Sequence, residues 1–174
     1  GTAWPPLSNE ALEGARGAAR PVALLVSRRA CPRCEALEKA AFSDEAVAAV
    51  LAGRFTTLGV DADERPDVAG GLADTLLLLP DRTTTLDPGL SALVVTTPDL
   101  RPFDGTGLVR EGRPVSPSSL LAFLVRVADA WEADRASLEA RAGLALAALR
   151  AAQEPGPPLP ALSASLLGRP LAGL

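Results

Sequence analysis

The sequence predicts one α/β domain in which a mixed central sheet carries helices on both faces, followed by a C-terminal tail. Short continuous apolar runs, typical of strands buried on both faces, alternate with segments of helical periodicity. The only two cysteines, Cys31 and Cys34, stand directly between the first predicted strand and its helix. A chain of 174 residues that is 48% apolar can bury one ordinary core, so we expect a single domain over 1–152 and a tail over 153–174.

Capping residues and apolar runs place the elements of the first half. In chain order they predict a helix capped by Ser8 (9–20), a strand (21–26), a helix beginning at the cysteines (to 41), a helix capped by Ser43 (44–52), a strand (55–60), and a helix with Pro66 at its first position that Pro80 ends.

The second half predicts a polar loop (81–89), a strand (90–97), a Pro98-Asp99 turn, a further strand (101–109) and one long helix from Ser116 to about 152. The order is α-β-α-β-α-β-β-α, with parallel crossovers first and an antiparallel hairpin last. This is the order of a thioredoxin-like fold. A CxxC beside a βαβ pattern is the redox signature of that fold.

Composition excludes several classes of function. The net charge of −4 attracts neither nucleic acid nor anionic lipid. No apolar run reaches the length of a membrane-spanning helix, so we expect a soluble, cytoplasmic domain. The chain contains no histidine, which excludes Ser-His and Cys-His catalysis and imidazole-ligated metals. We expect no cofactor.

The cysteine pair is the only evident chemical centre. A cysteine at the first turn of a helix has a lowered thiol pKa, because backbone N–H groups and the helix dipole stabilise the thiolate. Cys31 is therefore the candidate nucleophile and Cys34 the candidate resolving thiol, with Arg28, Arg29 and Arg33 close enough in sequence to stabilise a thiolate. The alternative is that both cysteines are buried and act only as small apolar residues.

Three other patterns have simpler explanations. Zinc needs four ligands, and two thiols without histidine do not supply them, so we expect no metal site. The acidic run Asp61–Asp67 lacks the glycine and terminal glutamate of a calcium loop, and capping of a helix N-terminus is the simpler role. Glu35 and Glu38 could accept a proton from Cys34, although solvated helix charges are the simpler explanation for both.

Several segments resemble one family, the spermatogenesis-associated-protein thioredoxin-like family, over about 3–152. They are Trp4-Pro5, Cys31-x-x-Cys34, Phe42-Ser-Asp-Glu-Ala-Val47, Val60-Asp-Ala-Asp-Glu-Arg-Pro-Asp-Val68 and Thr97-Pro-Asp-Leu-Arg-Pro-Phe103. The resemblance implies a thioredoxin-like domain that precedes a large helical-barrel domain. Only about twenty residues follow Gln153, so activity that depends on the barrel is not expected of this chain.

This chain departs from the family pattern around the thiols. In the family that this chain resembles, the motif around the thiols is similar to Cys-His-Trp-Cys-His. This chain instead has Pro32 and Arg33 between its cysteines and Glu35 after them. Counting back from Thr97 places Leu90 and Ser91 where the family has Trp and the cis-proline that faces the CxxC, unless Pro88 takes that role after a register shift. The candidate substrate-binding residues are Pro32, Arg33, Leu90, Ser91 and, at the rim, Arg65.

Two hypotheses follow for function. In the first, the domain is a thiol–disulfide oxidoreductase whose partner is a protein or small-molecule thiol or disulfide. In the second, it is a degenerate thioredoxin-like module that binds or positions a partner without turnover. The preserved CxxC favours the first, and Pro32 and Ser91 favour the second.

Overall fold

A computed structural model describes residues 2–78, 91–110 and 112–153. Its elements, in chain order, are α1 (Asn9–Ala18), β1 (Val22–Ser27), α2 (Pro32–Phe42), α3 (Glu45–Arg54), β2 (Thr56–Asp61), α4 (Pro66–Leu77), β3 (Ala92–Thr96), β4 (Pro102–Gly107), β5 (Val109–Arg110), β6 (Arg113–Pro114), α5 (Pro117–Ala133) and α6 (Arg135–Gln153).

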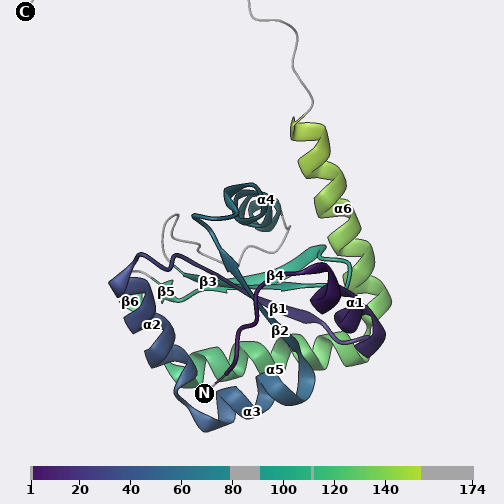
Figure 1. Cartoon of the computed structure of the whole chain (residues 1–174). Helices are drawn as coiled ribbons and strands as arrows, with labels where there is room; N and C mark the ends of the chain where they lie inside the picture. The colour runs from purple at the N-terminus through teal and green to yellow at the C-terminus, as the bar shows by residue number, and fades with distance from the viewer. Residues whose placement is uncertain (1, 79–90, 111, 154–174) are drawn as a thin grey trace, which may run out of the picture.

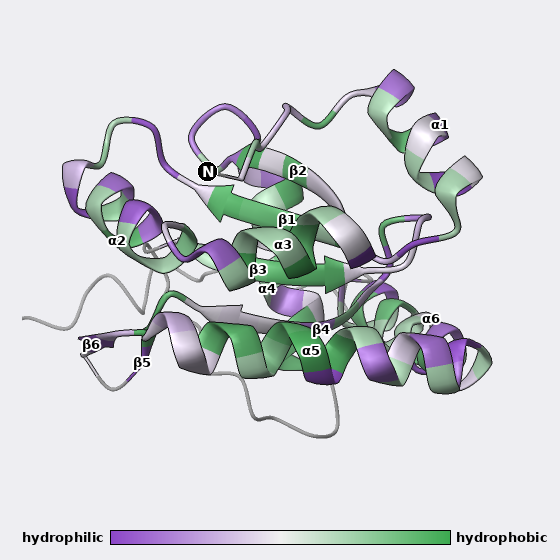
Figure 2. Ribbon diagram, turned by 90° about the horizontal axis from the view of Figure 1, so that it is seen from below, coloured by the Kyte–Doolittle hydropathy of each residue, from purple (hydrophilic) through white to green (hydrophobic). Residues whose placement is uncertain are grey.

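The main sheet has four strands in the order β2-β1-β3-β4. β1 is parallel to β2 and antiparallel to β3, and β3 is antiparallel to β4, so the predicted mixed sheet is confirmed. Only the first crossover is parallel, and the expectation of more than one was wrong because the chain returns through α4 to an antiparallel β3. Figure 2 shows β1 and β3 in the hydrophobic colour, as expected of central strands covered on both faces.

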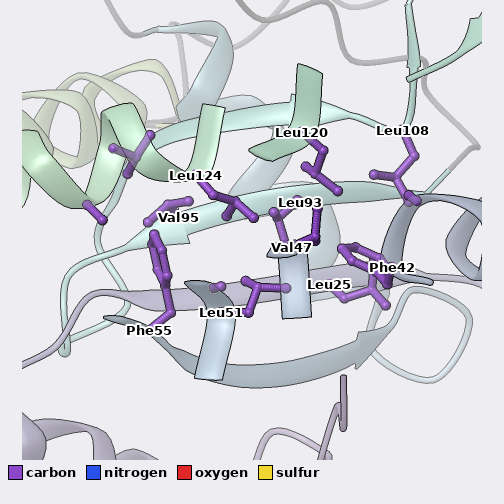
Figure 3. Close-up of a cluster of buried hydrophobic side chains, with 14 of the residues drawn as sticks. Leu25, Phe42, Val47, Leu51, Phe55, Leu93, Val95, Leu108, Leu120 and Leu124 are labelled. Atoms are coloured by element: carbon purple, nitrogen blue, oxygen red, sulfur yellow. The ribbon is translucent and has the colours of Figure 1, made fainter. Parts of the chain in front are cut away.

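Helices cover both faces of this sheet (Figure 1). On the α2, α3 and α5 side, alternate strand residues such as Leu25, Leu93 and Val95 pack against helix residues such as Leu51 and Leu124, as Figure 3 shows. On the α4 side, the intervening strand residues form a second cluster, which includes Leu24, Leu58, Val94, Leu72 and Leu76. Period-two alternation therefore divides each central strand between two cores.

The predicted long C-terminal helix is two helices. Asp134 has extended φ of −151°, which ends α5, and its backbone N–H donates to the Ala130 carbonyl at 3.0 Å. Its Oδ1 then accepts from the Ser137 N–H at 3.0 Å and caps α6. The bend directs α6 past the β4 edge, where it contacts α4, α5 and β4. No glycine or proline marks this bend in the sequence.

Other boundaries also differ from the prediction. Asp44, rather than Ser43, caps α3, because its Oδ1 accepts from the N–H groups of Ala46 and Val47 at 2.9 and 3.0 Å. Ser43 instead ends α2 and donates to the Ala40 carbonyl. The predicted strand 101–109 is divided between β4 and the small β5–β6 hairpin. The Ser8 cap and the prolines at the starts of α4 and α5 are confirmed.

The N-terminal segment lies beside β2, which the sequence did not predict. Pro6 pairs with Gly59 in parallel; Leu7 donates to the Gly59 carbonyl at 3.0 Å, and Gly59 donates to the Pro5 carbonyl at 2.7 Å. Trp4 then packs on Phe42 of α2, with ring centroids 4.9 Å apart. A Cβ on residue 59 would lie 3.2 Å from the Trp4 carbonyl oxygen, so glycine permits this close approach.

Several predicted features fall outside the described residues. They are the helix end at Pro80, the polar loop 81–89 with Pro88, Leu90, and the tail from 154 onward. In the part of the chain that the structure describes, no helix is long and apolar enough to cross a membrane.

Candidate redox site

The cysteine pair lies where β1 leads into α2. Cys31 is the N-cap of α2 and Pro32 occupies the first helical position, where its missing N–H costs no hydrogen bond. Cys31 and Cys34 form a disulfide with their Cα atoms 5.2 Å apart. The Cys34 N–H donates to Cys31 Sγ at 3.1 Å, so the helix N-terminus directs a backbone dipole at this sulfur.

The two sulfurs differ in exposure. Cys34 is completely buried, whereas Cys31 is half-buried. Pro32 and Arg33, between them, are exposed. Cys31 is therefore partly open to solvent beside the exposed Pro32 and Arg33, whereas Cys34 is enclosed by protein.

The arginines before the pair are already engaged. Arg28 forms an ion pair with Asp63 at 3.3 Å, and Arg29 lies 3.4 Å from Asp61 and 3.8 Å from Glu64. Their charge is thus shared with carboxylates at the end of β2 and in the loop that follows it, which reduces what they contribute to a thiolate. Arg33 forms no ion pair with any described residue and is the cation that remains beside Cys31.

Glu38 links the cysteine helix to the end of β1 and to the residue before β3. It follows Cys34 by one helical turn and is half-buried, and its Oε1 accepts hydrogen bonds from the hydroxyls of Ser27 and Ser91. Ser91 is 1% exposed, so its side chain faces this carboxylate rather than solvent. Ser91 also accepts from the Leu108 N–H at 2.9 Å through its carbonyl. The segment expected opposite the CxxC is thereby fixed to α2 through Glu38.

Arg65 precedes α4 on an exposed surface. Its guanidinium donates to both carboxylate oxygens of Asp67 at 3.1 Å. This paired hydrogen bond raises the pKa of Arg65 and lowers the pKa of the Asp67 carboxyl. Arg65 is thus close to the site loop but bound within its own helix terminus.

A cavity of about 240 Å³ lies beside the loop that joins β1 to Cys31. We call it the β2-side cavity. Its apolar walls include Trp4, Leu25 and Val60, and its charged lining comprises Arg29, Glu38, Asp61, Glu64 and Arg65. The Asp61 side chain is only 8% exposed, whereas that of Arg29, its partner, is 74% exposed. The Asp61 carboxylate therefore lies inward, whereas the Arg29 guanidinium and the Glu64 carboxylate lie towards solvent.

Comparison with known proteins identifies the family. Residues 2–150 match the Thioredox_DsbH family, described as "Protein of unknown function, DUF255". The chain belongs to this family. Its CxxC and its α/β fold are those that the sequence predicted for a thioredoxin-like member.

Curated relatives of this DUF255 chain are much longer than it is. "Spermatogenesis-associated protein 20" of Homo sapiens is 27% identical over 135 residues, which cover 78% of this chain and 16% of that protein. "Uncharacterized protein B0495.5" of Caenorhabditis elegans is 34% identical over 102 residues, covering 59% of this chain and 13% of that protein. The chain therefore spans about a sixth of the length of the first of these relatives.

Solved structures agree on the fold. A thioredoxin from Thermus thermophilus superposes with a TM-score of 0.54 at 22% identity, covering 74% of this chain and 88% of that one. A disulphide isomerase from Xylella fastidiosa Temecula1 superposes with a TM-score of 0.51 at 18% identity, covering 73% of this chain and 97% of that one. At these identities the likeness establishes a thioredoxin-like fold for this DUF255 chain.

The sequence missed several residues around this site. Ser27 carried no motif, Trp4 was noted only as part of the family resemblance, and Glu38 was one of two equivalent helix glutamates. Their proximity depends on pairing between segments far apart in the chain. One signal was present, because Glu38 is four residues after Cys34 and so shares its helix face, which Glu35 does not.

Proposed function

We propose that this chain is a thiol–disulfide oxidoreductase domain with Cys31 as nucleophile and Cys34 as resolving thiol. The observation that carries the proposal is the asymmetry of the pair, since a half-buried sulfur at a helix N-cap is joined to a fully buried one. A protein or small-molecule disulfide is the partner. A cytoplasmic location, expected from the sequence, is part of the same proposal.

The exchange proceeds in two balanced steps. The Cys31 thiolate attacks one sulfur of the substrate disulfide, forming a mixed disulfide and releasing the first substrate thiolate, which takes a proton. Cys34, after losing its proton, attacks Cys31 Sγ. This step forms the Cys31–Cys34 disulfide and releases the second substrate thiolate. The domain is oxidised by two electrons and the substrate is reduced; the reverse sequence oxidises a substrate dithiol.

Pro32 and Arg33 are proposed as the surface that meets the substrate, since both are exposed between the sulfurs. Arg65 is proposed at the rim. The Leu90–Ser91 segment is proposed on the other side of the site; within it, the Ser91 side chain supports the site through Glu38 rather than by touching substrate.

A second function is favoured by one observation. Ser91, in the family register of the cis-proline, is buried and hydrogen-bonded to Glu38, so its side chain is not presented to a substrate chain. That arrangement suits a module that binds a partner without exchanging disulfides.

A single-turnover assay distinguishes the two. Reduced protein is mixed with a cystine peptide, and both the released peptide thiol and the Cys31–Cys34 disulfide are quantified. The oxidoreductase gives one of each per chain, C31S gives neither, and C34S accumulates a peptide adduct on Cys31 that mass spectrometry locates. Wild-type protein that releases no thiol would leave only the binding module.

A further inference from the structure

We infer that the β2-side cavity binds the ammonium group of a substrate lysine, with Glu38 as its counter-charge. The inference rests on the proposed function and names the class of substrate: a polypeptide with a lysine close to the cysteine that Cys31 attacks.

The charges around the cavity leave Glu38 without a cation. Arg29 is shared by Asp61 and Glu64, and Arg65 is directed to Asp67. Glu38 accepts two hydroxyl hydrogen bonds, but no lysine or arginine among residues 2–78, 91–110 and 112–153 forms an ion pair with it. A half-buried carboxylate with neutral partners attracts a cation more strongly than an exposed, solvated one.

The shape of the cavity favours lysine over other cations. Its volume of about 240 Å³ is smaller than the ~300–1,000 Å³ that holds a drug-sized ligand, so the occupant is one side chain or a small molecule. The walls formed by Trp4, Leu25 and Val60 suit an aliphatic stem. Both hydroxyls bind Oε1 of Glu38, which leaves Oε2 as a single acceptor. A compact ammonium fits one acceptor better than a planar guanidinium, which prefers two.

The cavity is close enough to the disulfide to act on the same substrate. Arg29, at its mouth, is two residues before Cys31, so their Cα atoms are at most about 7 Å apart. An extended peptide advances about 3.3 Å per residue. A lysine two or three residues from the substrate cysteine therefore reaches the cavity while the cysteine sulfur meets Cys31.

Two matched peptides test this. Both carry one cysteine as a mixed disulfide with thionitrobenzoate, and they differ only in having lysine or norleucine two residues beyond it. Reduced protein releases the coloured thiolate when Cys31 attacks the peptide sulfur, and the second-order rate constants are compared at low salt. We expect the lysine peptide to react about tenfold faster, a ratio that corresponds to about 1.4 kcal/mol.

Glu38→Gln should reduce this ratio to about one by slowing only the lysine peptide. The matched control is Glu35→Gln, which removes an equal charge from an exposed position on the same helix and should keep the ratio. A wild-type ratio near one would overturn the inference, and so would a tenfold ratio that survives in E38Q. If E38Q does not fold, n-butylammonium is added to the wild-type protein instead. It should lower the rate constant of the lysine peptide and leave that of the norleucine peptide unchanged, and equal rate constants with and without it for the lysine peptide would overturn the inference.

The failure of the proposed function would be seen separately. If neither peptide releases thiolate, the oxidoreductase proposal is wrong, and the indole N–H resonance of Trp4 then tests the cavity alone. A shift with n-butylammonium but not with n-butanol supports the ammonium site, and no shift with either overturns it.

Discussion

Cys31 and Cys34 share one helical turn but differ in their access to solvent. The half-buried Cys31 accepts a hydrogen bond from the Cys34 N–H at the helix N-terminus, and Cys34 is completely buried. Burial in apolar surroundings raises a thiol pKa, while a helix N-terminus lowers it. We therefore expect the two thiols of this short motif to differ in reactivity.

In reduced protein near neutral pH, limiting alkylation should modify Cys31 before Cys34. Peptide mapping after a time course measures both rates, and reduced, unfolded protein, in which the two thiols are equally accessible, is the control. Equal and slow modification of both in the folded state would indicate inert buried cysteines.

The Arg65–Asp67 pair gives a second prediction at this scale. Because Arg65 lowers the pKa of Asp67, Arg65→Ala should move that pKa back up towards the ordinary value for aspartate, as measured by the Asp67 carboxyl carbon resonance during acid titration. A carboxyl whose pKa is lower in the folded state stabilises the fold above its unfolded pKa, and this contribution disappears as the pH falls through the folded pKa. Both side chains are exposed, so the effect on stability should be small. An unchanged Asp67 titration in R65A would show that the pair does not form in solution.

At the scale of elements, Asp134 decides the course of the C-terminal half. One residue ends α5 through its backbone and begins α6 through its carboxylate. Because of this change of direction, Ala142 packs in the hydrophobic cluster on the α2, α3 and α5 side of the sheet. Ala145 packs in the cluster on the α4 side. A straight helix over the same residues would leave the β4 edge of the sheet without α6.

Asp134→Ala should lower the free energy of unfolding by about 1 kcal/mol, the usual cost of losing an N-cap. Asp134→Asn keeps an oxygen acceptor for the Ser137 N–H, so it should lower the free energy of unfolding much less than the alanine variant does. Urea denaturation of both variants measures the difference. If the alanine variant is as stable as wild type, the cap does not maintain the bend.

Local signals predicted much of the fold and only part of the site. The apolar run of β1, the Ser8 cap and the prolines at two helix starts act within a few residues, so sequence reveals them. The bend at Asp134 depends on packing against β4. The setting of Glu38 depends on Ser27 and Ser91, which are 64 residues apart in the chain. The ion pairs of Arg28 and Arg29 escaped the sequence analysis for the same reason, because their partners lie at the end of β2 and just after it.

At the scale of the whole molecule, the redox pair lies outside the two large hydrophobic clusters, although Cys34 itself is buried. The described members of both hydrophobic clusters include neither cysteine. The disulfide closes a loop of only four residues, so the entropy it removes from the unfolded chain is small. We therefore expect the fold to depend little on the oxidation state of the pair.

Reduction should therefore leave the protein folded and cooperative, with a loss of unfolding free energy of no more than about 2 kcal/mol on the chain-entropy estimate. Guanidinium denaturation with and without a dithiol reductant measures this, and C31S/C34S serves as a control that cannot reoxidise. Loss of a cooperative transition on reduction would mean that the disulfide maintains the fold.

The N-terminal segment beside β2 has a practical consequence for preparing the protein. It occupies backbone groups of β2 that would otherwise form an open sheet edge, and exposed edges invite pairing with a second molecule. A chain shortened to begin at Ser8 would uncover that edge and lose Trp4 from the cavity wall. Aggregation of such a shortened protein would reflect the lost edge cover, and its solubility should be restored by supplying residues 2–7 as a separate peptide.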